Sequence, residues 1–386
     1  MTTDEQYMRR ALDLARAGVG LVSPNPAVGA VVVDASGREV GAGTHTYDGV
    51  KHAEVLALEQ AGHASRGGTL YLNLEPCSHR GRTGPCADAA IAAGIRRVVC
   101  SMQDPNPRVA GQGFAKLRDA GIAVQVGVFE AEAKKLNESF AKYIQSGKPL
   151  VTLKSALTLD GKIADASKPG VEPGCAPPAT EGARSGYHWI TGEIARAHVQ
   201  ELRHQSDAIL AGVGTVLADD PLLTDRSGRP RRRKLLRVIL DSYLRIPLTS
   251  RVIQTADNDV LVLHSIAEEQ PRRALEAKGI RVQQIASTAD GRPDFAAIIK
   301  SLGELEITSL LIEGGALVNG AALASGEVDK VFLYYAPKIF GDGAVPFIAG
   351  ESLHGKAQCV QKLELHRFGE DFAVEGYLRD PYTAST

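Results

Sequence analysis

Apolar residues recur along the first 130 residues in two alternating patterns, the spacing of amphipathic helices and the short β-branched runs of buried strands. Glycines close several of the helical stretches, as expected of a chain with many turns. The pattern predicts helices over residues 7–17, 52–62, 86–93 and 112–120, and strands over residues 27–33, 69–74, 97–101 and 122–128. Such alternation predicts an α/β sheet with helices on its faces.

The same alternation starts again after a polar helical stretch at residues 130–146 and a short linker at residues 146–149. Strands are predicted over residues 150–157, 208–211, 237–240, 260–264, 281–285, 309–312 and 330–335, and helices over residues 194–205, 267–278, 295–302 and 316–324. We find no internal repeat, so we expect two different α/β domains, residues 1–147 and residues 148–386. Two long loops interrupt the second domain, one rich in glycine, proline and alanine (residues 167–186) and one basic (residues 226–237).

Length and charge narrow the classes of function. The 386 residues exceed one ordinary domain of ~150 residues. Forty-four basic and 45 acidic residues give a net charge of -1, which disfavours a protein that coats nucleic acid or an anionic membrane. No apolar run approaches the ~20 residues of a membrane span, and the charged N-terminal stretch lacks the apolar core of a signal peptide. We therefore expect a cytoplasmic protein without nucleic-acid or membrane partners, whose basic cluster at residues 229–234 is a solvated loop.

The strongest chemical signal combines His52 and Glu54 with Cys77 and Cys86. Five scattered cysteines do not resemble a disulfide framework, so reduced thiols are available for a metal. One imidazole and two thiolates would fill three positions of tetrahedral zinc and leave the fourth open to water, whose pKa zinc lowers to ~7. Glu54, two residues from a ligand, would then shuttle protons, as in the zinc nucleobase deaminases. The eight residues between the two cysteines depart from the two-residue gap of those enzymes.

Three other interpretations stay open at this point. A histidine and a glutamate at a helix start are often surface residues, and two cysteines in a loop are often inert. A structural zinc module would need a fourth protein ligand. A deaminase acting on RNA, with the second half as an adaptor, would carry more positive charge than this chain does.

Several motifs together resemble one known family. LEPCSHRGRTGPC (residues 74–86), PNPAVG (24–29) and SMQDPNP (101–107) are similar to the bifunctional deaminase/reductase family of riboflavin biosynthesis. The resemblance continues through KSALTLDGK (154–162), WIT (189–191), GTVLADDP (214–221) and EGG (313–315), and so covers nearly the whole chain. One departure is Gly84, where the family has a second proline.

The resemblance implies an N-terminal cytidine-deaminase-like three-layer domain and a C-terminal dihydrofolate-reductase-like α/β domain. It implies zinc-dependent deamination of a small phosphorylated pyrimidine, followed by NADPH-dependent reduction of its ribosyl group. It also implies one Zn²⁺ per chain and a homo-oligomer, either a dimer or a tetramer. By this likeness His52, Cys77 and Cys86 bind zinc and Glu54 is catalytic. Its implied deaminase substrate contacts are Asn25, His45, His79, Arg82, Asp104 and Asn106. Asn25 and Asp104 stand beside prolines, so each could instead only shape a turn.

The resemblance also implies a reductase site that the second half alone does not reveal. No Gly-x-Gly-x-x-Gly fingerprint opens a βαβ unit there, and a single Gly-Gly turn is weak evidence for a phosphate site. The implied cofactor residues are Ala156, Trp189, Thr215, Asp219, Ser242, Gly315, Ala316, Leu317, Val318, Asn319, Gly320 and Ala321. The implied substrate residues are Arg203, Leu223, Arg226 and Glu313, with Lys154 and Asp160 as polar neighbours. Trp189, the only tryptophan, could equally be a packing residue.

Overall fold

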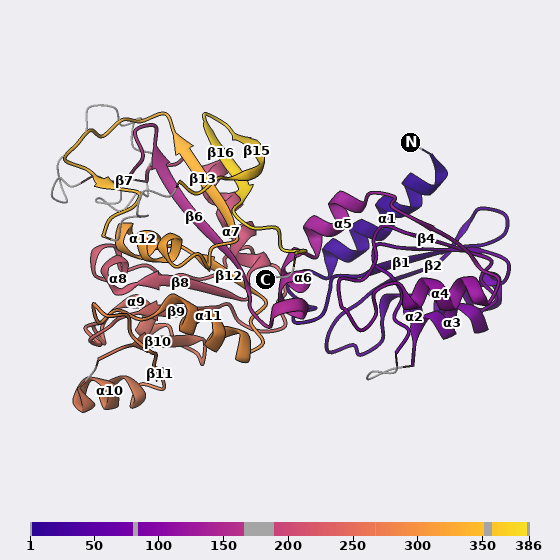
Figure 1. The fold of residues 1–386 in the computed structure, drawn as a ribbon, viewed down its shortest axis with the longest axis horizontal. Helices are drawn as coiled ribbons and strands as arrows, with labels where there is room; N and C mark the ends of the chain where they lie inside the picture. Colours follow the sequence, from indigo (N-terminus) through magenta and orange to yellow (C-terminus); the bar gives the residue numbers. More distant parts are fainter. Residues whose placement is uncertain (1, 80–83, 166–188, 267, 351–356, 384–386) are drawn as a thin grey trace.

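The computed structural model describes residues 2–79, 84–165, 189–266, 268–350 and 357–383. Two units lie side by side, each built on its own sheet, and the helix that connects them lies at their junction (Figure 1). Two features named above, Arg82 and the loop over residues 167–186, lie outside the described residues. No helix in the described ranges is long and apolar enough to cross a membrane.

The N-terminal unit is a five-stranded sheet between two layers of helices. Its strands are β1 (Gly29–Val33), β2 (Glu39–Thr44), β3 (Thr69–Leu72), β4 (Arg97–Cys100) and β5 (Ala123–Val126), in the order β2-β1-β3-β4-β5. β1 is antiparallel to both of its neighbours, whereas β3, β4 and β5 are parallel. The helices are α1 (Thr3–Ala17), α2 (Ala53–Ala61), α3 (Cys86–Ala92), α4 (Gln112–Asp119), α5 (Glu130–Leu136) and α6 (Glu138–Ser146), with a 3₁₀ turn, η1, at Gly62–Ser65. α2, α3 and α4 cover the face opposite α1 and α5 (Figure 1).

The pattern of apolar positions did not predict β2, whose sequence EVGAGT is half glycine and alanine. Its glycines are required by the helix that packs on it. A Cβ atom on Gly41 would lie 2.1 Å from the carbonyl oxygen of Ala57, and one on Gly43 would lie 2.2 Å from that of Ala53. Only glycine lets α2 approach this closely, so packing overrides the low strand propensity of glycine.

The C-terminal unit is a nine-stranded sheet in the order β11-β10-β9-β8-β12-β6-β13-β16-β15. The strands from β11 to β13 are parallel, and β16 and β15 add an antiparallel hairpin at one edge. These strands are β6 (Leu150–Thr158), β8 (Ala208–Gly212), β9 (Leu236–Leu240), β10 (Val260–His264), β11 (Arg281–Gln284), β12 (Ser309–Ile312), β13 (Lys330–Ala336), β15 (Gln361–Phe368) and β16 (Asp371–Tyr377), and a separate pair joins β7 (Lys162–Ala164) to β14 (Val345–Pro346).

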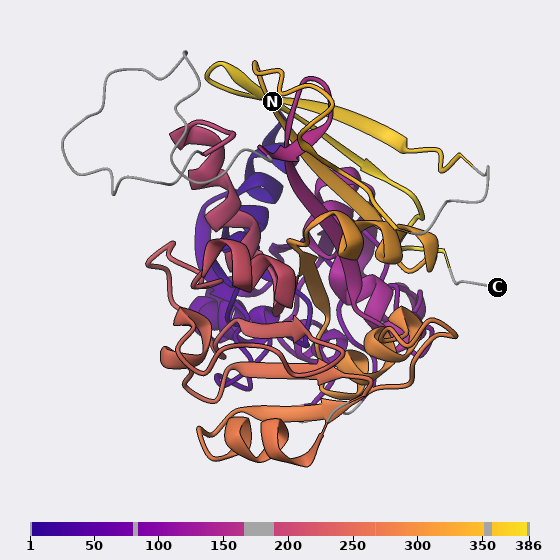
Figure 2. The same cartoon turned by 90° about the vertical axis from the view of Figure 1, so that its left-hand side faces the viewer.

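Helices cover both faces of this sheet, as a parallel sheet requires (Figure 2). They are α7 (Glu193–Gln205), α8 (Val213–Asp219), α9 (Arg251–Gln254), α10 (Glu269–Glu276), α11 (Phe295–Glu304) and α12 (Ala316–Ala324). One apolar core packs under α11 and the strands facing it, and a second packs under α8 and α9. Every strand and helix predicted in this half is present, while α8, α9, β7, β14 and the β15–β16 hairpin were not predicted.

The basic cluster is solvated only in part, contrary to the prediction: Arg229 and Lys234 are exposed, but the three arginines between them are not. The side chains of Arg231, Arg232 and Arg233 are only 13%, 22% and 28% exposed. Arg231 donates to backbone carbonyls at the end of α7, and the other two reach the N-terminal unit. From the sequence alone, such a cluster is expected to be solvated, because the residues of the N-terminal unit that bind it are about 200 positions away in the chain.

Candidate active sites

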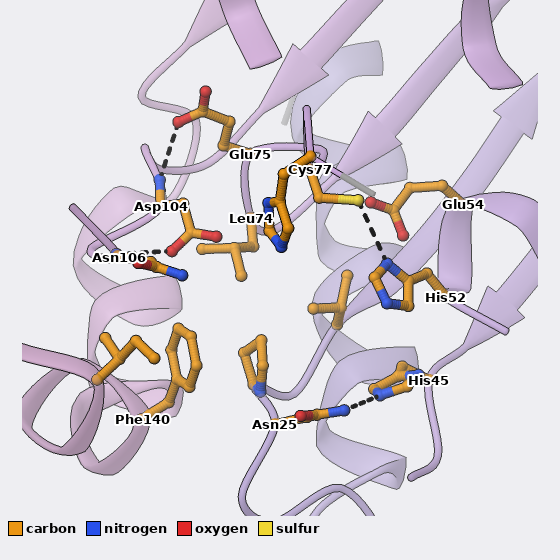
Figure 3. Close-up of a pocket in the computed structure, with 14 residues that line it drawn as sticks. Asn25, His45, His52, Glu54, Leu74, Glu75, Cys77, Asp104, Asn106 and Phe140 are labelled. Carbon is orange, nitrogen blue, oxygen red and sulfur yellow. Dashed lines mark hydrogen bonds between the residues drawn. The ribbon is translucent and has the colours of Figure 1, made fainter. Parts of the chain in front are cut away.

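Three candidate zinc ligands converge at the N-terminal ends of two helices. His52 is the N-cap residue of α2, and Cys86 is the first residue of α3. Cys77 follows β3, and its sulfur accepts a hydrogen bond from the backbone N–H of Cys86 at 3.3 Å. The Nδ1 atom of His52 lies 3.6 Å from Sγ of Cys77 (Figure 3). The same nitrogen lies 3.2 Å from Sγ of Cys86. Helix N-termini favour negative charge, so this position suits thiolates.

The chemistry of these donors fits zinc. The three ligand atoms lie within 4.8 Å of one another, and a tetrahedral site with one open position needs three such ligands. Hydrogen bonds from the Cys86 thiol and from His52 lower the pKa of Cys77, so this sulfur is readily deprotonated. His52, Cys77 and Cys86 are therefore the residues that would hold the ion.

Glu54 lies beside these ligands in the first turn of α2 (Figure 3). Its side chain is buried, and its Oε2 atom has no hydrogen-bond partner among the described residues. Burial raises the pKa of this carboxyl above its usual range. A buried carboxyl oxygen without a partner normally costs free energy, so its presence next to the three candidate metal ligands indicates a chemical role.

The described members of the predicted deaminase substrate set line one pocket together with the candidate ligands His52 and Cys77. These members are Asn25, His45, His79, Asp104 and Asn106. Nδ1 of His45 lies 3.0 Å from the carbonyl oxygen of Lys51, and Nε2 lies 3.0 Å from Nδ2 of Asn25. If Nδ1 carries the proton, Nε2 accepts from the Asn25 amide, which leaves the Asn25 carbonyl oxygen directed at the pocket.

A buried carboxylate shapes the opposite wall of this pocket. Glu75 accepts hydrogen bonds from the backbone N–H groups of Asp104, Gly111, Gly113 and Phe114 at 2.9–3.2 Å. Asp104 in turn accepts from the backbone of Asn106, so it shapes a turn and also lines the pocket. Burial raises the pKa of Asp104 to about 7.

A second cluster of charges lies in the C-terminal unit, at the end of β12. Glu313 accepts two hydrogen bonds from Arg203 of α7 at 2.8 and 3.0 Å, and Nζ of Lys154 lies 3.4 Å away. Burial alone would raise the pKa of Glu313, but the charges of Arg203 and Lys154 outweigh it and lower that pKa to about 2. Lys154 and Ala156 alternate with buried residues along β6 and so share one face.

The loop after α8 passes the same cluster. Arg203 also donates to the carbonyl oxygen of Thr224 at 2.9 Å. Leu223 is buried with a φ of 55°, a left-handed conformation that is rare for a bulky residue and typical of functional sites. Burial and the nearby charge of Arg203 lower the pKa of Arg226. The predicted substrate residues of the reductase thus lie in one neighbourhood.

The predicted cofactor residues lie on several elements around α12. Gly315 is the N-cap of this nine-residue helix, and a Cβ atom on it would meet nothing nearer than Oγ1 of Thr215 at 3.6 Å. This open backbone at a helix N-terminus fits a phosphate-bearing cofactor such as NADPH. Leu317 is exposed, while Asn319 is fully buried and donates to the carbonyl oxygen of Phe347. Ala316 and Gly320 are buried, and Val318 and Ala321 are partly buried.

The remaining predicted reductase residues are spread around this region. Asp219 ends α8, and burial raises its pKa. Ser242 follows β9. Trp189 is 57% exposed, with the Arg196 guanidinium 5.1 Å from its ring, so it is not a core packing residue. Asp160 accepts from the backbone of Phe340 and Gly341 and so caps a turn.

Both halves of the chain match families of known proteins. Residues 1–102 match the cytidine and deoxycytidylate deaminase zinc-binding region, and residues 149–374 match the RibD C-terminal domain. The riboflavin biosynthesis protein RibD of Aquifex aeolicus is 40% identical over 371 residues, which cover 96% of this chain and 97% of the relative. The Escherichia coli protein of the same name is 41% identical over 352 residues, 88% of this chain and 89% of the relative. The chain belongs to the RibD family.

Solved RibD structures have the same architecture along the whole chain. The structure of Acinetobacter baumannii RibD is 34% identical and superimposes with a TM-score of 0.79 over 97% of this chain and 98% of that one. A diaminohydroxyphosphoribosylaminopyrimidine deaminase/5-amino-6-(5-phosphoribosylamino)uracil reductase from Thermotoga maritima is 37% identical, with a TM-score of 0.76 over 97% of this chain and 98% of that one. The predicted fold class is confirmed: a cytidine-deaminase-like domain precedes a dihydrofolate-reductase-like domain.

Membership of the RibD family makes the chain a bifunctional deaminase and reductase of riboflavin biosynthesis. It therefore combines a hydrolase with an oxidoreductase and acts on small substrates. Zn²⁺ and NADPH are the cofactors that fit its two domains.

Sequence reasoning missed one wall of the RibD deaminase pocket. Phe140 and Ile144 line it, and both come from α6, the helix that leads into the second domain (Figure 3). Asn137, just before α6, holds this helix in place, because its side-chain amide bonds both the N–H and the carbonyl oxygen of Ala27 at 2.8 and 3.1 Å. The only signal in the sequence was an apolar pair at i and i+4, which is typical of any packed helix.

Proposed function

We propose that the chain catalyses two consecutive steps of riboflavin synthesis. The first is hydrolytic deamination of 2,5-diamino-6-(5-phosphoribosylamino)pyrimidin-4(3H)-one to 5-amino-6-(5-phosphoribosylamino)uracil, with release of ammonia. The second is NADPH-dependent reduction of the ribosyl group of that product to ribityl. We assign deamination to residues 1–147 and reduction to residues 148–386, an assignment that the two separate sheets and the two matched families support.

In the deamination, Glu54 is the residue that moves protons. When bound by His52, Cys77 and Cys86, zinc supplies Lewis-acid activation of water near neutral pH. Glu54 takes the proton that the attacking water loses and delivers it to the departing amino group. Its buried carboxyl and raised pKa support this role, because a general acid–base group works best with a pKa near the working pH.

The polar residues of the pocket orient the pyrimidine. Asn25, held by His45, offers its carbonyl oxygen to ring N–H or amino groups, and Asp104 on the opposite wall contacts the other edge. Asn106 completes this polar wall. His79, exposed at the mouth, and Arg82 suit the phosphate by their charge. Phe140 gives the ring an apolar surface.

In the reduction, NADPH supplies the hydride, and the chain orients the sugar phosphate. We assign the phosphate contact to Arg226, because the Arg203 guanidinium is already held by Glu313 and Thr224. Arg203 then fixes Glu313, which holds Lys154 beside the sugar, and Leu223 contacts the substrate. The predicted cofactor residues around α12 hold the nucleotide.

Two further properties complete the proposal. The thiols of Cys77 and Cys86 must stay reduced to bind zinc, which supports a cytoplasmic location. We also propose a homo-oligomer, a dimer or tetramer, since the edge strand β15 exposes Leu363 and Leu365 to 55% and 71%. Light scattering of the purified protein would test the oligomeric state, and a monomer at working concentration would refute it.

The observation that carries the catalytic proposal is the convergence of His52, Cys77 and Cys86 beside the buried Glu54, in a chain that matches RibD proteins from end to end. Zinc-loaded protein should release ammonia from the diaminopyrimidine phosphate and then oxidise NADPH. Glu54→Gln should stop ammonia release but still reduce the deaminated intermediate supplied separately. If folded, zinc-loaded protein shows neither activity, the proposed function is wrong.

A further inference from the structure

The basic loop of the reductase domain contacts a loop of the deaminase domain through hydrogen bonds and a cation–π interaction. We call residues 225–233 the arginine segment and residues 19–25 the deaminase loop. The Arg232 guanidinium lies 3.6 Å from the ring centre of Tyr47, and its Nη1 donates to the carbonyl oxygen of Ser23 at 2.9 Å. Its backbone N–H donates to the carbonyl oxygen of Gly20 at 2.8 Å. Its Nε also donates to Oδ1 of Asp48 at 3.4 Å, so Arg232 makes four contacts with the other domain.

Arg233 and Asp207 hold Ser23 through its side chain. Nη2 of Arg233 donates to Oγ of Ser23 at 3.0 Å and also bonds the carbonyl oxygen of Glu306. Oγ of Ser23 in turn donates to Oδ2 of Asp207 at 2.7 Å. Because Arg233 and Asp207 both belong to the reductase domain, Ser23 is fixed by that domain at its backbone and at its hydroxyl.

The first part of the deaminase loop fits closely against α7. A Cβ atom on Gly20 would lie 2.9 Å from the ring of His204, so only glycine fits there. Nδ1 of His204 lies 2.9 Å from Asp225, and its Nε2 lies 3.3 Å from the carbonyl oxygen of Val19. The arginine segment and α7 therefore present a shaped surface to this loop rather than a single flexible contact.

The residues that Arg232 contacts lie close in the sequence to Asn25 and His45, which line the deaminase pocket. Asn25 follows Ser23 by two residues, and Tyr47 follows His45 by two. The N–H of Tyr47 donates to the carbonyl oxygen of Leu21 at 3.0 Å. This hydrogen bond connects the deaminase loop to the segment that carries His45 and Tyr47. Both partners of the Asn25–His45 hydrogen bond are therefore anchored through residues that Arg232 contacts.

We propose that Arg232 and Arg233 are positioning residues of the deaminase, supplied by the reductase domain. They hold the deaminase loop so that Asn25 faces the pyrimidine. The inference rests on the proposed substrate role of Asn25. By this inference, part of the basic cluster supports deamination, the first reaction of the enzyme. The sequence had suggested that the cluster was a solvated loop.

The test compares Arg232→Ala and Arg233→Ala with Arg229→Ala in the full-length, zinc-loaded protein. Arg229 is the matched control, because it belongs to the same segment but bonds Glu201 of its own domain. Each of the two test variants should raise the KM of deamination by about 5- to 30-fold, the range expected when hydrogen bonds that position a loop are lost, together with a cation–π contact in the case of Arg232. Reduction of the deaminated intermediate should keep its wild-type constants in all three variants, which also shows that they are folded.

A double-mutant cycle separates positioning from a merely structural role. If Arg232 acts through Asn25, Arg232→Ala should have little further effect on deamination in an Asn25→Ala background. Arg232→Lys, which keeps the charge over Tyr47, should recover part of the loss. A wild-type KM in Arg232→Ala, or an undiminished effect in the Asn25→Ala background, would overturn the inference. Wild-type protein that releases no ammonia would instead refute the proposed function, and the inference with it.

Discussion

Gly43 offers a direct test of how the fold positions the deaminase site. In Gly43→Ala, the new Cβ atom would lie 2.2 Å from the carbonyl oxygen of Ala53 and 2.9 Å from Cβ of Leu56. Real Cβ atoms essentially never come closer than 3.0 Å to such an atom, so α2 must retreat from β2 by about 0.8 Å. Ala53 stands between His52 and Glu54 in the chain, and the same movement therefore displaces the proposed zinc ligand and the proposed proton carrier.

The displacement is large compared with what the site tolerates. Zinc–ligand distances in proteins hold within about 0.2 Å, and a misplacement of about 1 Å at an active site can cost about 100-fold in rate. Overpacking of this kind typically lowers the free energy of unfolding by about 1–3 kcal/mol. We expect Gly43→Ala to lose bound zinc, measured by metal analysis, and to lose about 100-fold in kcat/KM for ammonia release. Reduction of the deaminated intermediate should be unchanged.

Gly68→Ala is the matched control in the same domain. Its Cβ atom would lie 2.2 Å from the carbonyl oxygen of Val33, an equally severe clash. Gly68 precedes β3, whereas Cys77 follows the other end of that strand. This variant should lose comparable stability in a denaturant titration but keep its zinc and its deaminase activity. If Gly43→Ala retained both while losing as much stability as Gly68→Ala, the argument that α2–β2 packing positions the site would be refuted.

Three other predictions concern the metal, a buried acid and the junction between the domains. Chelation should abolish ammonia release and spare the reduction, because all three ligands lie in the first domain; equal loss of both activities would contradict two separate sites. The folded-state pKa of Asp104 is about 7 against an ordinary 3.8, so the native state retains a proton that the unfolded chain releases as the pH rises through this interval. The stability advantage of Asp104→Asn over wild type should therefore grow by on the order of 2 kcal/mol between pH 5 and pH 8 in denaturant titrations, and a constant difference would refute it. Lys142→Met removes a buried partner 3.2 Å from Asp329 and should lower the free energy of unfolding by about 3–5 kcal/mol, whereas Lys148→Met, which breaks a more exposed pair with Glu327, should cost at most about 1 kcal/mol; equal costs would contradict the role of burial.

The sequence predicted the parts of the fold that local patterns determine. Buried strands such as β1 and β8 are short β-branched or apolar runs, and nothing about their surroundings was needed to find them. β15 was missed for a different reason, since its apolar alternation is limited to Leu363 and Leu365 and its residues are mostly exposed. The candidate zinc ligands were predicted from their residue types and their order along the chain, and the structure brings them together because His52 and Cys86 start helices and Cys77 follows β3.

What the sequence could not predict lies at the junction of the two domains. Ser23 and Arg232 are 209 residues apart in the chain, and Asn137 and Ala27 are 110 apart. No periodicity reports such contacts, because periodicity reflects only neighbours within a few turns. The N-terminal zinc-binding region that matches other deaminases ends at residue 102, before Phe140 and before the arginine segment. The matched region therefore holds the candidate metal site, whereas the apolar wall of the pocket comes from α6 and the proposed anchors of Asn25 come from the second domain. Joining the two activities in one chain thus gives the deaminase structural support that its own sequence motif lacks.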